Sequence, residues 1–123
     1  MIYIAVPYSH KNKETVLDRV EKFCRADAIF IASGLITVSP ISKHFILDYQ
    51  NLPGNWIYWQ RYSFELLKNC KGIIVLMLEG WEESIGVACE IEYAKNSSIP
   101  IYYCDYNELL LNTDKFLKQF EEI

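Results

Sequence analysis

The feature that most constrains the fold of this chain is a set of four short apolar runs separated by helix-like segments. The runs are Ile2–Val6, Leu35–Ser39, Gly72–Met77 and Ile101–Cys104, and three of them border a proline. Runs this short and nearly continuous in apolar residues are typical of strands that are covered on both faces. Their alternation with helices indicates a largely parallel sheet.

The segments between the runs carry apolar residues at helical spacing. One helix is expected from Val16 to Phe30, with Gly34 as its C-terminal stop, and a second from about Asn55 to Asn69. A third is expected to begin at Ser84, a good N-cap, and a last one near Thr113, another cap. These elements predict a single α/β domain over residues 1–123. We expect a doubly wound, Rossmann-like or flavodoxin-like sheet with flanking helices.

Composition narrows the possible partners. The chain has 123 residues, of which 51% are hydrophobic and 23% charged, as in a packed globular domain. Its net charge of −4 argues against binding to a nucleic-acid polymer or an anionic membrane surface. The sequence has no apolar run of bilayer length, and Met1 leads into a strand without a basic flank. We therefore expect a cytoplasmic protein with a small-molecule partner and no membrane partner.

The four cysteines are far apart in the sequence and form no CxxC motif: Cys24, Cys70, Cys89 and Cys104. This spacing favours neither a zinc site nor a disulfide framework, so we expect buried free thiols. We expect no metal ion and no cofactor.

Ligands of open parallel sheets bind beyond the carboxyl ends of the strands. The segments Pro7–His10, Pro40–His44 and Leu78–Gly86 follow the first three strands and should form any binding edge. His10 and His44 lie there, although a lone loop histidine is more often a surface residue. No nucleophile is paired with either of them in the sequence.

The strongest local signal is the segment from Gly80 to Glu90. Ser84 and the backbone amides near Gly86 could hold a phosphate or carboxylate at the start of a helix. Gly86 would allow a ligand to approach closely. Glu90 lies one turn further on the same side, where its carboxylate could act as a nucleophile. The alternative is that Ser84 only caps the helix and that the glutamates are solvated. Glu92 should face the solvent.

Aromatic residues near this edge could stack on a base or a sugar. Trp81, in a loop beside the helix start, is the better ligand candidate, and Tyr8 and Trp56 could join it. Trp59 falls on the apolar stripe of its helix and is expected in the core.

Taken together, these residues resemble the nucleoside 2-deoxyribosyltransferase-like superfamily, which includes nucleotide N-hydrolases. The match is with a group of short bacterial and phage proteins of unknown function within it, over about residues 1–104. It rests on Ile4–Ser9, Ser39–Ile41 with His44, Trp56–Gln60, Val75–Ser84 and Glu90–Ala94.

The resemblance implies roles for several residues. Glu90 matches the glutamate that attacks the anomeric carbon and forms a glycosyl-enzyme intermediate, and Tyr8 lies in the loop around the sugar. Ser84 matches a residue that contacts the 5'-phosphate. We expect Ser9, His44, Trp81, Ser84 and Gly86 to bind the substrate. The resemblance also implies a homo-oligomer whose sites are completed by a neighbouring subunit.

The sequence departs from the superfamily pattern at two positions. Ser63 stands where relatives often carry an aspartate that helps to bind or protonate the leaving base, and Lys71 replaces an acidic residue. Glu82, Glu83 or Tyr8 could take over the role of the second acid. The leading hypothesis is an N-glycosidase or deoxyribosyltransferase acting on a nucleoside or nucleotide. The alternatives are a non-catalytic nucleotide-binding protein, as a carrier or scavenger of a nucleotide-like signal, and a purely structural domain.

Overall fold

The computed structural model describes residues 1–121, which form a four-stranded parallel sheet in the order β2-β1-β3-β4. The strands are β1 (Ile2–Ala5), β2 (Thr37–Val38), β3 (Gly72–Met77) and β4 (Ile101–Asp105). In the register, Ile2 lies opposite Thr37 on one side and Gly72 on the other. The predicted α/β fold with a parallel sheet is therefore confirmed.

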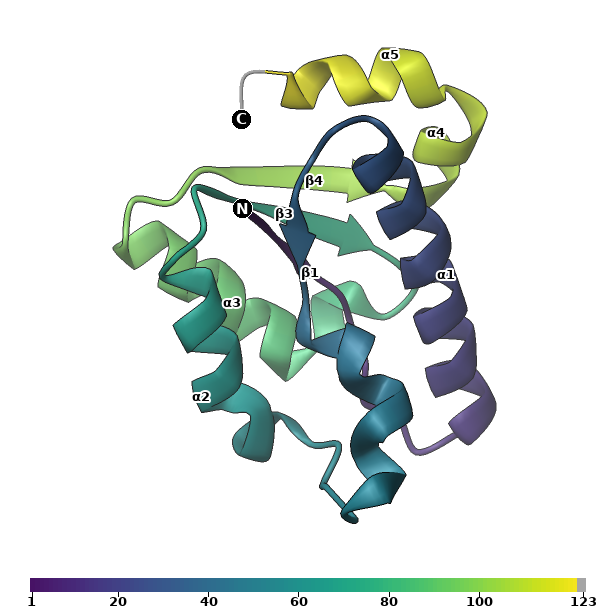
Figure 1. The fold of residues 1–123 in the computed structure, drawn as a ribbon, viewed down its shortest axis with the longest axis vertical. Helices are drawn as coiled ribbons and strands as arrows, with labels where there is room; N and C mark the ends of the chain where they lie inside the picture. The colour runs from purple at the N-terminus through teal and green to yellow at the C-terminus, as the bar shows by residue number, and fades with distance from the viewer. Residues whose placement is uncertain (122–123) are drawn as a thin grey trace.

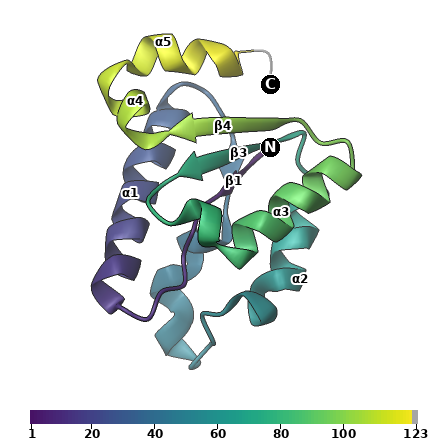
Figure 2. The ribbon, with the colours of Figure 1, turned by 180° about the vertical axis from the view of Figure 1, so that it is seen from behind.

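Helices cover both faces of the sheet (Figure 1). The long helix α1 (Lys13–Ala32) lies on one face, and α2 (Trp56–Leu67) and α3 (Ile85–Asn96) lie together on the other, as the reverse view in Figure 2 also shows. Because side chains alternate along a strand, Ile2 and Ile4 face α1, whereas Tyr3 and Ala5 face α2 and α3. This alternation decides which residues of β1 reach the site described below.

The expected second strand, Leu35–Ser39, is reduced to two residues. The Ser39 hydroxyl donates a hydrogen bond of 2.7 Å to the carbonyl of Ile4, where a longer strand would continue the backbone ladder. Pro40 then begins η1 (Pro40–Tyr49), a 3₁₀-helical segment in place of the expected loop. This segment brings Ile41 into the core and His44 to the edge of the sheet.

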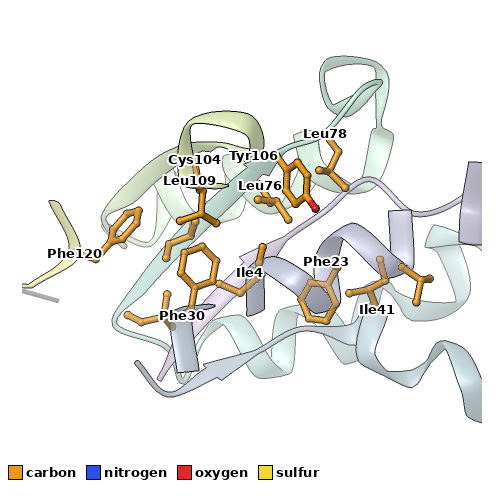
Figure 3. Close-up of a cluster of buried hydrophobic side chains, with 14 residues drawn as sticks. Ile4, Phe23, Phe30, Ile41, Leu76, Leu78, Cys104, Tyr106, Leu109 and Phe120 are labelled. Carbon is orange, nitrogen blue, oxygen red and sulfur yellow. The ribbon is translucent and has the colours of Figure 1, made fainter. Parts of the chain in front are cut away.

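The larger of the two core clusters lies between α1 and the sheet (Figure 3). It includes residues from the C-terminal segments α4 (Tyr106–Leu111) and η3 (Lys118–Phe120), and residues of α5 (Thr113–Leu117) pack against it. Phe120 packs edge-to-face on Phe30 of α1, with ring centroids 5.9 Å apart. The smaller cluster lies under α2 and α3 and includes Leu67, Val87 and Ala94.

Two helix-end predictions have different outcomes. Helix α1 ends as expected, with Gly34 in a left-handed conformation at φ +102°. At the C-terminal end, however, the chain forms the additional helix α4, which the sequence analysis did not predict. Thr113 does not cap the following helix, because its hydroxyl donates to the Leu109 carbonyl at 2.8 Å.

The cysteines are free, and their burial differs from the expectation. Cys70 and Cys104 are buried, but Cys24 is exposed and Cys89 is half-buried. Cys24 follows the buried Phe23 on α1, and one step along a helix turns a side chain by about 100° toward the solvent. Within residues 1–121, every helix is too short or too polar to cross a membrane.

Candidate functional site

A cavity of about 530 Å³ opens beyond the carboxyl ends of β1 and β2. Its walls come from the loop after β1, from η1, and from the beginnings of α2 and α3. It contains six of the seven predicted site residues: Tyr8, Ser9, His44, Ser84, Gly86 and Glu90. The position agrees with the rule that open parallel sheets bind ligands at this edge.

Glu90 lies at the buried end of this cavity. Ser84 caps α3 by accepting a hydrogen bond from the Val87 N–H at 3.2 Å, and Glu90 then falls on the helix face that packs on the sheet. Its side chain is only 6% exposed and accepts a hydrogen bond from the hydroxyl of Tyr3 on β1. Glu92, two positions along, is exposed as expected. The alternative of a solvated Glu90 is therefore wrong.

Burial controls the protonation of this pair. Loss of hydration raises the pKa of Glu90 to about 8, although the hydrogen bond from Tyr3 acts in the opposite direction. Burial, together with the charge of Glu90, raises the pKa of Tyr3 well above 10.0. Tyr3 therefore keeps its proton at neutral pH and remains a hydrogen-bond donor to Glu90.

Ser63 of α2 is the buried neighbour of this pair. Its side chain is 2% exposed, lines the cavity and lowers the pKa of Tyr3 by hydrogen bonding. Among the described residues, the cavity is lined by two carboxylates, Glu90 and the exposed Glu83. No second buried acid therefore lies beside Glu90 in this part of the chain.

Tyr8 and His44 form a second polar pair in the cavity. The Tyr8 hydroxyl and the His44 Nδ1 are 2.6 Å apart, and the two rings meet edge-on. Burial and the negative charge of Asp48 raise the pKa of Tyr8, so its hydroxyl is protonated at neutral pH. The Tyr8 loop is tied to the chain before α2, since the Ser9 hydroxyl donates to the Gly54 carbonyl at 2.9 Å.

Gly86 has a packing role that differs from the expected one. A Cβ atom at this position would lie 3.1 Å from Cε3 of Trp56, so the glycine lets the indole of α2 pack against the start of α3. The first amides of a helix have no partner within the helix, and Ser84 accepts that of Val87. Ile85 and Gly86, whose amides precede it in α3, both line the cavity. They could hold an anionic group there.

Trp59 and Trp81 lie elsewhere than expected. Trp56 and Trp59 line the cavity, and the indole N–H of Trp59 donates to the Pro53 carbonyl at 2.7 Å. Trp81 lies in η2 (Trp81–Glu83), outside the set of cavity residues. It packs on the core cluster under α2 and α3 and lies beside Tyr103. Trp59, expected in the core, is thus the cavity residue.

Arg19 of α1, one of several cations in the sequence, has a role that the sequence alone did not assign. Its guanidinium is buried and donates to the carbonyls of Tyr8, Ser9 and Glu79, which joins the loops after β1 and β3. Gly80 makes room for it, since a Cβ there would lie 2.5 Å from Nη2. The sequence signal that could have indicated this role is the position of Arg19, a charged residue directly beside Val20 of the apolar stripe of α1.

The positions of Tyr3 and His10 also differ from what the sequence indicated. Tyr3 was also missed, and its only signal is a hydroxyl within an otherwise aliphatic strand. His10 lies outside the cavity and accepts a hydrogen bond from the Asn12 N–H at 2.9 Å, so it helps to shape the turn before α1. Residues 1–121 contain no cluster of His, Cys, Asp and Glu side chains that could hold a metal ion.

Comparison with protein-family models assigns most of the chain to a family. Residues 1–105 match the family DUF1937, described as a domain of unknown function. The chain belongs to this family. The DUF1937 match ends at the last residue of β4, so it includes every residue of the cavity and leaves out α4, α5 and η3. A search of curated proteins found no match for the chain.

Proposed function

We propose that this DUF1937 protein cleaves the bond between base and sugar of a nucleoside or nucleotide, as an N-glycosidase or deoxyribosyltransferase. The observation that carries the proposal is the placement of Glu90, which is buried, held by the Tyr3 hydroxyl and open to a cavity. The resemblance of the motifs around Tyr8, Ser84 and Glu90 to the nucleoside 2-deoxyribosyltransferase-like superfamily supports it.

In the proposed reaction, the ionised carboxylate of Glu90 attacks the anomeric carbon while the base departs. Water then releases the sugar in a hydrolase, or a second base accepts it in a transferase. The Tyr3 hydroxyl keeps one carboxylate oxygen hydrogen-bonded, which orients the other for attack.

The shape and lining of the cavity fit this class of substrate. Its volume of about 530 Å³ lies within the range of small-molecule sites. Trp56 and Trp59 line the cavity, and aromatic rings of this kind can stack on a flat base. At the start of α3, the first backbone amides offer hydrogen-bond donors to a 5'-substituent such as a phosphate.

A second candidate function rests on Ser63. Where a base-protonating acid would be expected, the cavity has a hydroxyl, and the pKa of Glu90, at about 8, leaves the carboxyl mostly protonated at neutral pH. A protein with these features could bind a nucleotide without cleaving it. Thermal stabilisation by a nucleotide that is recovered intact would favour this candidate.

The first prediction tests the reaction itself. The purified protein should release free base from at least one member of a panel of nucleosides, nucleotides and ADP-ribose compounds, measured by chromatography. Glu90→Gln should reduce the rate by at least about 10³-fold, because it removes the nucleophile and keeps the shape of the side chain. Glu92→Gln, on the exposed side of α3, is the matched control and should retain activity.

Two results would contradict the proposal. Wild-type protein that releases no base from the whole panel would leave the binding function as the better candidate. Equal activity of Glu90→Gln and wild type would exclude Glu90 as the nucleophile.

We also propose a second copy of this chain as the protein partner. Ile57 of α2 and Ile85 of α3 line the cavity, yet their side chains are 85% and 71% exposed. Apolar side chains grouped at the mouth of a cavity are typical of surfaces that another protein covers.

A further inference from the structure

Cleavage of a base from a sugar needs a proton donor as well as a nucleophile. As the bond to the sugar breaks, its electron pair moves to the base, which leaves more easily when it is protonated. Ser63 cannot provide this acid, because a serine hydroxyl is too weakly acidic. The proton must therefore come from another group in the cavity.

The remaining candidates can be compared by position. Glu90 is occupied as the nucleophile and by its contact with Tyr3. Glu83 is exposed at the end of η2 rather than enclosed in the cavity. The Tyr8 hydroxyl is half-buried in the cavity and keeps its proton at neutral pH. It is also 2.6 Å from an imidazole nitrogen that can share a proton with it.

Three contacts hold this pair in a fixed position. The edge of the Tyr8 ring packs at Gly54, where a Cβ would lie 3.5 Å from Cε2, and His44 packs edge-on against Phe45 at 5.0 Å between centroids. Arg19 of α1 donates a hydrogen bond to the Tyr8 carbonyl at 3.4 Å. The Tyr8–His44 pair and Glu90 thus line the same cavity but come from different elements. Tyr8 lies in the loop after β1, His44 in η1 and Glu90 in α3.

We propose that the Tyr8 hydroxyl gives its proton to the departing base and that His44 is a positioning residue, whose Nδ1–H donates to the Tyr8 oxygen. This inference rests on the proposed function and assigns the acid that Ser63 does not supply. With Nδ1–H directed at the phenol oxygen, the Tyr8 O–H is free to point at the substrate, and the developing phenolate is stabilised.

The two steps balance in protons and electrons. In the first, a bond forms between a Glu90 oxygen and the anomeric carbon, the bond from that carbon to the base breaks, and the base takes the proton of Tyr8. In the second, water attacks the same carbon, Glu90 leaves, and the proton of the water returns to the Tyr8 phenolate. Tyr8 is thus the acid of one step and the base of the next.

The test compares leaving groups that differ in their need for a proton. One substrate is the nucleoside or nucleotide that the panel identifies, and the other is the 4-nitrophenyl glycoside of the same sugar, whose leaving group departs as a stable anion. Tyr8→Phe keeps the ring that packs at Gly54 and removes the acid. It should lower kcat/KM for the natural base by about 10²–10⁴-fold and for the nitrophenyl substrate by less than about tenfold.

Two variants of His44 separate positioning from structural support. His44→Phe keeps the edge-on ring contacts and removes the donor, so it should show the same dependence on the leaving group as Tyr8→Phe, with a smaller loss. His44→Asn places an amide N–H close to the position of Nδ1 and should recover most of the activity that His44→Phe loses. Melting temperatures close to that of wild type would show that both variants are folded.

Failure of this inference can be distinguished from failure of the proposed function. Equal loss on both substrates for Tyr8→Phe, or no loss on either, would overturn the assignment of Tyr8 while Glu90 stays the nucleophile. Equal activities of His44→Phe and His44→Asn would overturn the role of His44. Wild-type protein that cleaves neither substrate would overturn the proposed function and this inference together.

Discussion

At the scale of single residues, Glu90 is a buried carboxyl group whose ionised form is disfavoured by the fold. Its pKa, at about 8 in the folded state, lies above the ordinary value of 4.5, so the folded protein binds this proton more tightly than the unfolded chain does. Stability from this group is fully present below the unfolded pKa of 4.5 and is lost progressively as the pH rises from there through the folded pKa of about 8. At neutral pH the cost is on the order of a few kcal/mol. A buried carboxyl with this cost is typical of functional sites.

The same raised pKa predicts how activity depends on pH. Glu90 must be ionised to attack, so kcat/KM should rise about tenfold per pH unit below pH 8 and level off above it. Tyr3→Phe removes the hydrogen bond that lowers the pKa of Glu90, and the rising limb should move to higher pH. The measurement is the pH profile of base release.

Tyr106→Phe is the matched control for this experiment. Tyr106 is a buried tyrosine of the larger core cluster and lies outside the cavity. Its variant should keep the wild-type profile. An unshifted limb in Tyr3→Phe would show that the hydroxyl does not act on the ionisation of Glu90.

At the scale of elements, the loops after β1 and β3 depend on a cation that comes from α1. The Arg19 guanidinium binds carbonyls of both loops, at 3.0 Å from Ser9 and 3.2 Å from Glu79. Gly80, at φ +87°, supplies the space for it. The start of α3 and the Tyr8 loop, which lie far apart in the sequence, are therefore held in one arrangement.

Two glycines allow this link to be measured by urea unfolding. Gly34→Ala meets no atom within 4 Å, so its cost of about 1 kcal/mol comes from the positive φ alone. Gly80→Ala has the same backbone strain and also displaces Arg19, so we expect about 1–2 kcal/mol more. In an Arg19→Met background this excess should disappear. Equal costs of the two glycine substitutions would mean that Arg19 moves aside without loss.

The elements differ in how far the sequence could predict them. The strands β1 and β3 and the helices α1, α2 and α3 follow from apolar periodicity and caps, which are local signals. The reduction of β2 depends on the contact of Ser39 with a distant carbonyl, and η1 follows from it. Such long-range contacts have no local signal in the sequence.

The candidate site was predictable to a similar extent. Glu90, Tyr8 and His44 follow short distances along the chain from strand ends or caps, and the topology brings them to one cavity. Tyr3 gains its role because it lies on the sheet face that α3 covers, where its hydroxyl contacts Glu90. Trp81 was expected at the ligand and Trp59 in the core, but η2 places Trp81 against the core. These roles depend on which face of an element meets the cavity.

At the scale of the whole molecule, each face of the sheet carries one core cluster, and the cavity lies at the sheet edge between them. The α1 face carries the larger core cluster, which Phe120 extends beyond the region of the family match. The opposite face, under α2 and α3, has the smaller cluster. The cavity lies where the two meet, since its lining includes Ile4 and Ile41 of the larger cluster and Tyr3 of the smaller one. Apolar side chains remain exposed at its mouth.

This exposure predicts self-association through the beginnings of α2 and α3. A symmetric dimer would place Ile57 and Ile85 of one copy against the same surface of the other and remove them from water. Light scattering after size exclusion should show a dimer or larger assembly for wild type and a shift to monomer for Ile57→Lys. Leu111→Lys, at a residue that is 78% exposed on α4, is the control and should stay associated. A monomeric wild type at high concentration would exclude the interface, and so would dissociation by both variants alike.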